Sequence, residues 1–163
     1  MLRPGAAAYV CHANQKAGIY SAFESALLQA DFQIAGCLVW VKPSATMGWQ
    51  DYRSRYEPLL YGWKRGADRR KVEDRTETNV WEIGREAVAD YEHPTQKPVE
   101  LPLRAIRNSA RAGETVLDLF GGSGSTLIAA AKAGCKTVLV ENDPGYCDVI
   151  RQRWERFIRK AFP

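Results

Sequence analysis

The sequence predicts an α/β fold, and three observations support this prediction. Residues 115–143 have the pattern of a strand, a glycine turn, a helix and a second strand that ends on an acid, which is typical of a parallel βαβ unit. Strand-like and helix-like segments also alternate further upstream. With 163 residues, the chain is long enough for one domain with a proper hydrophobic core.

The N-terminal part is predicted to contain several strands and one helix. An apolar strand is expected at Ala6–Cys11, followed by a helix at Ile19–Ala30 and a strand at Gln33–Val41. Another strand is expected at Glu57–Trp63. One face of the predicted helix carries its apolar residues, namely Ile19, Phe23, Ala26 and Leu27.

The composition changes after Lys64. Residues 64–90 contain few apolar side chains and mix acids with basic residues, namely Arg65, Arg69, Arg70, Lys71, Arg75 and Arg85. Such a mixed-charge run predicts a loop or a small insert, and a solvated loop without a binding role remains an open alternative.

The βαβ unit follows a helix that ends at Gly113. The apolar positions of that helix share one stripe, and they are Val99, Leu103, Ile106 and Ala110. The unit itself is predicted as a strand at Val116–Phe120, a helix at Ser125–Lys132 that stops at Gly134, and a strand at Thr137–Val140.

The last predicted helix is Gly145–Arg159. Its apolar stripe is expected in the core and consists of Tyr146, Val149, Ile150, Trp154, Phe157 and Ile158. Its arginines are expected to form a solvated face rather than a DNA surface, and they are Arg151, Arg153, Arg156 and Arg159.

The glycine turn indicates which ligand it suits. Gly122 and Gly124 fit the first half of a dinucleotide motif, but Leu127 stands where the third glycine belongs. Asp118, just before the turn, would repel a pyrophosphate and attract a cation, and Glu141 can accept hydrogen bonds from ribose hydroxyls. S-adenosylmethionine, which has ribose hydroxyls, positive charge and no phosphate, fits these residues. A packing turn without ligand is the alternative.

Two motifs carry a family resemblance. The first is His93–Pro98 (HPTQKP), and the second is Asp118–Thr126 (DLFGGSGST). At both motifs the chain resembles the DNA amino-methyltransferases, which methylate adenine N6 or cytosine N4. The motif order resembles the permuted class, in which the catalytic half precedes the cofactor half. The resemblance implies a Rossmann-like S-adenosylmethionine-dependent methyltransferase fold, a three-layer sandwich, and double-stranded DNA as partner.

The resemblance also implies a set of cofactor-binding residues. They are Thr95, Gln96, Lys97, Pro98, Asp118, Phe120, Gly121, Gly122, Ser123, Gly124, Ser125, Thr126 and Glu141. It further implies a partition into residues 1–63, from the catalytic half, residues 64–92, a loop or small target-recognition insert, and residues 93–163, the cofactor-binding half. His93 is expected to order its loop.

One expected motif is missing. Family members carry an Asp-Pro-Pro-Tyr-type loop that handles the target amino group, whereas this sequence contains no Pro-Pro. Asp143-Pro144-Gly145-Tyr146 is similar, but Asp-Pro is a good helix start and this segment is expected to be structural. We therefore assign no catalytic residue.

The resemblance thus implies a C-terminal part of a methyltransferase domain, with an incomplete sheet. The missing catalytic strand would lie centrally, between the strands at Ala6–Cys11 and Thr115–Phe120, and its loss would leave two unpaired edges. Three outcomes are then open: another polypeptide supplies the missing strand with the N-terminal half, the sheet closes up, or the isolated chain is poorly stable. The chain alone is expected to bind the cofactor weakly or not at all and to be inactive.

Three functions remain open at this stage. The first is a truncated or split DNA methyltransferase, with adenine N6 favoured over cytosine N4. The second is a non-catalytic cofactor or DNA-binding module that needs a partner, and the third is an NAD-dependent oxidoreductase, which Leu127 and the HPTQKP segment disfavour.

Composition narrows the remaining classes. The sequence has no signal-like start and no membrane-length apolar run, so a cytoplasmic protein is expected. The cysteines lack a C-x-x-C pairing, which predicts buried, reduced thiols and no metal site: Cys11, Cys37, Cys135 and Cys147. A net charge of +4 is compatible with DNA but does not demand it. His12, at the end of a strand, is expected to be structural.

Overall fold

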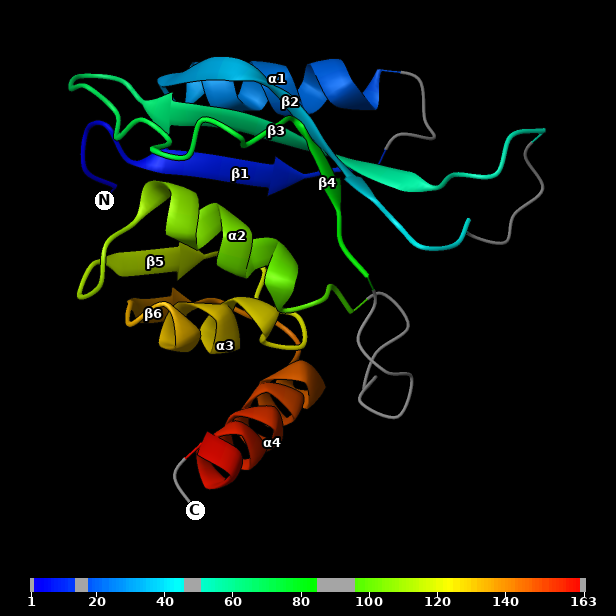
Figure 1. Cartoon of the computed structure of the whole chain (residues 1–163), viewed down its shortest axis with the longest axis vertical. Helices are drawn as coiled ribbons and strands as arrows, with labels where there is room; N and C mark the ends of the chain where they lie inside the picture. Colours follow the sequence, from blue (N-terminus) through cyan, green and yellow to red (C-terminus); the bar gives the residue numbers. More distant parts are fainter. Residues whose placement is uncertain (1, 14–17, 46–50, 85–95, 162–163) are drawn as a thin grey trace. The chain divides into compact units, whose positions relative to one another are not determined.

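The computed structural model describes residues 2–13, 18–45, 51–84 and 96–161 (Figure 1). The chain divides into two compact units, Met1–Gly84 and Arg85–Pro163. Both units combine strands with helices, which confirms the predicted α/β class.

The first unit contains a four-stranded sheet in the order β1-β3-β2-β4. β3 (Tyr56–Lys64) lies between β1 (Ala7–Cys11) and β2 (Phe32–Val41) and is antiparallel to both. Pro58, Leu59 and Leu60 are consecutive buried residues of β3, as expected for a central strand covered on both faces. The three predicted strands are therefore confirmed to within one residue at each end.

The fourth strand was not predicted. β4 (Val80–Glu82) lies inside the mixed-charge segment and pairs in parallel with the end of β2, placing Trp81 opposite Trp40. The indole N–H of Trp40 donates to the carbonyl oxygen of Ile83 over 3.0 Å. A strand of three residues is too short to show a two-residue alternation, which is why the sequence pattern misses it.

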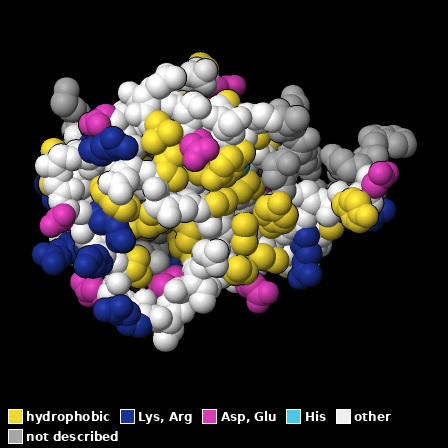
Figure 2. Space-filling view, turned by 90° about the horizontal axis from the view of Figure 1, so that it is seen from above, with side chains coloured by type: hydrophobic (Ala, Val, Ile, Leu, Met, Phe, Trp, Pro, Cys, Tyr) yellow, Lys and Arg dark blue, Asp and Glu magenta, His cyan; other side chains and the backbone are white. Residues whose placement is uncertain are grey.

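The helix of the first unit, α1 (Ile19–Gln29), packs on β2 but buries none of its side chains. Of the predicted apolar face, Ile19 and Leu27 have intermediate exposure, whereas Phe23 and Ala26 are exposed. The predicted face is therefore only partly covered. Figure 2 looks onto the side where α1 lies in Figure 1 and shows hydrophobic side chains gathered in one area of that face.

The second unit contains the predicted βαβ arrangement (Figure 1). β5 (Thr115–Asp118) and β6 (Lys136–Leu139) are parallel, in register from Thr115 opposite Lys136, and α3 (Ser125–Lys132) connects them. α2 (Glu100–Ser109) packs against α3. The core between them is formed by Val99, Leu103, Ile106, Ile128, Ala129 and Ala130.

One face of the β5–β6 pair is exposed and apolar. Side chains alternate between the two faces of a strand, so Val116 packs on the core while Leu117 points to the opposite face. The exposed apolar residues of this pair and its ends are Leu117, Leu119, Val138 and Val140. Among the described residues β5 pairs with β6 alone, so its other edge has no neighbouring strand.

The final helix is α4 (Pro144–Ala161), which begins one residue before the predicted start. Within the described parts of the chain, no helix combines the length and apolar character needed to cross a bilayer.

Candidate functional site

The glycine turn connects the end of β5 to the start of α3. Gly122 and Gly124 have φ angles of 52° and 81°, in the left-handed region that glycine adopts without strain. The amide of Gly124 donates to the carbonyl oxygen of Gly121 over 2.8 Å, which closes the turn. α3 therefore starts directly after a left-handed residue, with its first amides directed toward the turn.

Close packing explains the absence of a side chain at Gly121 and Gly124, whereas the space beside Gly122 is open. A Cβ atom on Gly121 would lie 3.1 Å from a methyl group of Leu139, and a Cβ on Gly124 would lie 3.3 Å from Ile150 of α4. A Cβ on Gly122 would meet only the carbonyl oxygen of Phe120, at 3.9 Å. One side of the turn is therefore occupied by α4, and the room for a ligand lies beside Gly122.

Asp118 bridges the two ends of the turn. Its Oδ1 atom accepts a hydrogen bond from the amide of Phe120 over 3.0 Å, and its Oδ2 atom accepts one from the hydroxyl of Thr126 over 2.6 Å. The Phe120 side chain between them is 87% exposed. Asp118 thus holds the turn in shape, while an aromatic ring stands free in solvent beside it.

Glu141 holds the turn from the neighbouring strand. Its Oε2 atom accepts from the amide of Gly122 over 2.7 Å, and its Oε1 atom accepts from the amides of Asn142 and Asp143 over 2.9 and 3.0 Å. These backbone hydrogen bonds lower the pKa of the Glu141 carboxyl. The bond from the amide of Asp143 has the largest effect, followed by the bond from Gly122. Since each carboxylate oxygen accepts about two hydrogen bonds, Oε2 keeps capacity for a ligand hydroxyl.

The two carboxylates make this end of the sheet negative. Among the described residues, neither Asp118 nor Glu141 has a lysine or arginine as ion-pair partner. A negative turn with a spare carboxylate acceptor suits a cationic ligand with hydroxyl groups better than a phosphate. The residues present therefore fit the cofactor that the sequence predicts.

The segment before α2 meets the glycine turn. The hydroxyl of Ser125 donates to the carbonyl oxygen of Lys97 over 2.6 Å. Gln96 and Pro98 are buried on either side of Lys97. The two predicted motifs are thus joined by a hydrogen bond, whereas Thr95 and His93 lie outside the described residues.

Arg153 is a residue of this site that the sequence analysis missed. The prediction of a solvated arginine face is wrong at this position, because the Arg153 side chain is buried. Its Nη1 atom lies 3.1 Å from both the carbonyl and the hydroxyl oxygen of Ser123 and 3.0 Å from the hydroxyl of Ser125, so its two N–H groups are shared among three acceptors. A signal exists in the sequence, because Arg153 is one helical turn from both Ile150 and Phe157 and so lies within the apolar stripe.

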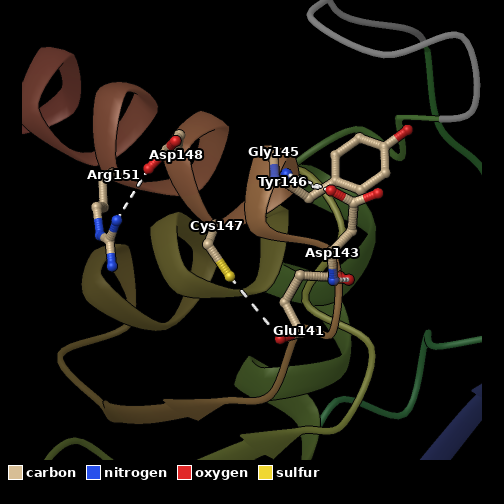
Figure 3. Close-up of polar contacts among 7 residues, drawn as sticks. All are labelled: Glu141, Asp143, Gly145, Tyr146, Cys147, Asp148 and Arg151. Carbon is tan, nitrogen blue, oxygen red and sulfur yellow. Dashed lines mark hydrogen bonds and ion pairs between the residues drawn. The ribbon is translucent and has the colours of Figure 1, made fainter.

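The Asp143–Tyr146 segment has the structural role that was expected (Figure 3). The Oδ1 atom of Asp143 accepts from the amides of Gly145 and Tyr146, over 2.7 and 3.3 Å, and so caps α4. The thiol of Cys147 points to the carbonyl oxygen of Glu141, at 3.8 Å. The start of α4 is therefore connected to the acidic end of β6.

The first unit contributes two further observations. The buried ring of His12 packs against Phe23 and Tyr20, with ring centroids 5.4 and 5.5 Å away. In the mixed-charge segment, the guanidinium of Arg69 lies 4.6 Å from the centre of the Trp63 ring. Among the residues that the structure describes, no group of acidic, histidine and cysteine side chains is arranged to hold a metal ion.

The cysteines are less buried than predicted. All four have intermediate exposure, including Cys11 and Cys37 in the first unit. Burial still raises the pKa of the Cys37 thiol and of the Cys135 thiol.

Comparison with known proteins shows where this architecture occurs. A family model described as DNA methylase matches residues 5–152. The type II methyltransferase M.BglI of Bacillus subtilis is 28% identical over 151 residues, covering 82% of this chain and 42% of its own length. M.HinfI of Haemophilus influenzae is 28% identical over 144 residues, covering 76% of this chain and 40% of its own length. The chain thus spans less than half of either relative.

A solved structure shows the same fold. The structure of the M1.HpyAVI–SAM complex has a TM-score of 0.81 with this chain at 20% identity, and the match covers 94% of this chain and 76% of that one. The predicted incomplete Rossmann-like methyltransferase fold is therefore confirmed.

Proposed function

Because this chain belongs to the DNA methylase family, we propose that it contains the cofactor-binding half and part of the catalytic half of a DNA amino-methyltransferase. The reaction is transfer of a methyl group from S-adenosylmethionine to an exocyclic amino group of DNA. The observation that carries the proposal is the glycine turn held between the carboxylates of Asp118 and Glu141.

Four residues at the turn have a defined role in this proposal. Glu141 accepts a ribose hydroxyl with the remaining capacity of Oε2, and its three backbone hydrogen bonds keep it ionised. Asp118 adds negative charge, which favours a cationic ligand. Gly122 leaves room for the ligand, and Phe120 offers an exposed ring for contact with it.

We assign the remaining described positions to the same site, with the hydrogen bond from Ser125 to the carbonyl oxygen of Lys97 in support. They are Gln96, Lys97 and Pro98 before α2, Gly121, Ser123 and Gly124 in the turn, and Ser125 and Thr126 in α3. Residues 93–163 would form the cofactor-binding half and residues 1–63 part of the catalytic half, with residues 64–92 between them.

S-adenosylmethionine, when bound, supplies an electrophilic methyl group on a positively charged sulfur. The residues of this chain then bind and orient the cofactor, and orientation alone contributes much of the rate of a group transfer. The target base must leave the duplex, because its amino group is inaccessible within the stack. Since the family methylates DNA, double-stranded DNA is the proposed substrate. Adenine N6 is the first amino group to test, before cytosine N4.

We also propose that additional polypeptide, on the same chain or on a separate one, supplies the loop that handles the base. No Pro-Pro motif is present in the 163 residues. The apolar face formed by Leu117, Leu119, Val138 and Val140, each between 41% and 55% exposed, supports this step because such a face is normally covered. This observation also favours the second candidate function, a binding module that is inactive without a partner.

Cofactor binding is tested first, by titrating the ¹⁵N-labelled chain with S-adenosylhomocysteine and, separately, with NAD. We expect amide shifts at Gly121–Thr126 with S-adenosylhomocysteine only. A response to NAD instead would favour the oxidoreductase. Because the chain alone is expected to bind weakly, the cofactor assignment would be refuted only if neither the chain alone nor the chain co-expressed with the polypeptide that supplies the missing loop responded to S-adenosylhomocysteine.

Activity is tested second, by measuring transfer of labelled methyl groups to DNA. The 163-residue chain alone is expected to transfer none, whereas co-expression with a polypeptide that carries an Asp-Pro-Pro-Tyr loop and its strand is expected to restore transfer. Robust methylation by the chain alone would refute the need for additional polypeptide. Failure of the co-expressed pair would indicate a decayed fragment and would count against a module that its partner completes. The proposed location of the protein is the cytoplasm, where DNA and cofactor occur together.

A further inference from the structure

Arg153 is a charged residue buried at an unusual place. Its side chain, on α4, is 9% exposed, and its Nη1 atom lies against the start of α3. The N-terminal end of a helix carries partial positive charge, so a cation there is electrostatically unfavourable. Removing a guanidinium from water is also unfavourable, unless hydrogen bonds replace its hydration. A leucine would complete the apolar stripe of α4 without these costs.

The hydrogen bonds of the Nη1 atom of Arg153 go to the glycine turn. Nη1 meets the carbonyl oxygen of Ser123, the hydroxyl of Ser123 and the hydroxyl of Ser125, all within 3.1 Å. Both serines are buried, so these acceptors have little access to water. Arg153 therefore supplies donors to the two residues that flank left-handed Gly124.

A second hydrogen bond extends this contact to another segment. Ser125 accepts from Arg153 and donates its own hydroxyl proton to the carbonyl oxygen of Lys97 over 2.6 Å. A hydroxyl that accepts from a cation becomes a stronger donor, so the two hydrogen bonds reinforce each other. The result is a continuous chain of contacts from α4, through the start of α3, to the segment before α2.

We propose that Arg153 is a positioning residue for the cofactor site. Through its hydrogen bonds, Arg153 fixes the position of the glycine turn relative to the Lys97 segment. This inference rests on the proposed function for the identity of the ligand, but its structural part concerns the turn alone. Arg153 acts through Ser123 and Ser125 and needs no contact with the ligand.

The main test replaces Arg153 with methionine, which keeps a long apolar stem and removes all donors. Arg153→Lys keeps the charge but not the fork of donors. The matched control is Arg151→Met, on the same helix, where the side chain is 73% exposed and pairs with Asp148. Three quantities are measured on the full 163-residue chain: the melting temperature, the hydrogen exchange of individual amides, and the affinity for S-adenosylhomocysteine.

In the Arg153→Met chain we expect amide exchange at Gly122 and Gly124, whose amides are hydrogen-bonded, to rise at least about tenfold, because the turn loses the hydrogen bonds of Arg153. A tenfold rise corresponds to about 1.4 kcal/mol of local opening free energy. Exchange at Gly134, at the other end of α3, should change much less. The affinity for S-adenosylhomocysteine should fall by about tenfold or more, with Arg153→Lys intermediate and Arg151→Met unchanged.

Two outcomes would overturn the inference. One is unchanged exchange and affinity in Arg153→Met. The other is a uniform rise in exchange over α2, α3 and α4, which would make Arg153 a purely structural residue. If Arg153→Met does not fold, Ser125→Ala replaces it as the test, because it removes the hydroxyl that contacts both Arg153 and Lys97. Faster amide exchange at the turn would support the inference, and unchanged exchange would overturn it. If the unmodified chain binds no S-adenosylhomocysteine, either alone or with the co-expressed polypeptide, the proposed function fails, whereas the exchange contrast still decides the role of Arg153.

Discussion

The carboxylate of Glu141 accepts a hydrogen bond from the amide of Gly122 over 2.7 Å, across 19 positions of sequence. This contact joins the end of β6 to the turn after β5. The residue expected to bind the cofactor ribose is therefore also a brace of the turn, so its two roles must be separated by experiment.

Glu141→Gln should weaken both roles. The amide of glutamine keeps one oxygen for Asn142 and Asp143 but places an N–H₂ group opposite the amide of Gly122, where two donors face each other. We expect affinity for S-adenosylhomocysteine to fall about tenfold or more, together with a lower melting temperature. Glu155→Gln is the control, since Glu155 is exposed on α4 and should leave both quantities unchanged. Equal affinities in the two variants would exclude Glu141 from the site.

The charge state of Glu141 predicts a pH dependence. Its folded-state pKa lies below the ordinary value, because backbone amides stabilise the ionised form. The stability that it contributes is therefore fully present above the unfolded pKa and is lost as the pH falls through the folded pKa. Following the Gly122 amide shift from pH 7 to pH 2 should give a midpoint below that of an unperturbed glutamate. A midpoint at or above the ordinary value would show that the hydrogen bonds do not persist in solution.

Gly124→Ala should destabilise the second unit. Gly124 has a φ of 81°, which costs a residue with a Cβ about 1–2 kcal/mol. The new methyl group would also lie 3.3 Å from Ile150. Urea unfolding measures the effect, with Gly84→Ala as control because a Cβ at Gly84 meets no atom within 4 Å. Equal unfolding free energies for the two variants would contradict the described turn.

Two leucines should respond differently to truncation. Leu103→Ala removes a buried side chain of the α2–α3 core and should cost about 2–5 kcal/mol of unfolding free energy. Leu119→Ala, where the leucine is 55% exposed beside β5, should change stability by no more than about 0.5 kcal/mol. If additional polypeptide covers that face, Leu119→Ala should instead weaken association with it, measured by co-purification. A large loss of stability in Leu119→Ala alone would indicate that the face is already covered in this chain.

The sequence pattern predicted most elements and the place of the candidate site. The βαβ unit was recognisable because a glycine turn between two short apolar strands is a local feature of the chain. β4 was missed, since three residues that pair with a distant strand have no local pattern. The helix α1 was predicted, but its predicted apolar face is only partly covered, with Phe23 and Ala26 exposed, because coverage depends on the sheet beneath the helix.

Local pattern therefore determined the strands, the helices and the two motifs, because periodicity and glycine conformations arise from neighbouring residues. The tertiary structure decided which polar groups meet. Arg153 lies in the apolar stripe of α4 by sequence, yet only folding brings it to Ser123 and Ser125, 30 and 28 positions away. The same holds for Glu141, whose oxygen reaches Gly122 only when β6 lies beside β5. A buried charge is stable only with such partners, and partners distant in sequence are assembled by the packing of the whole unit.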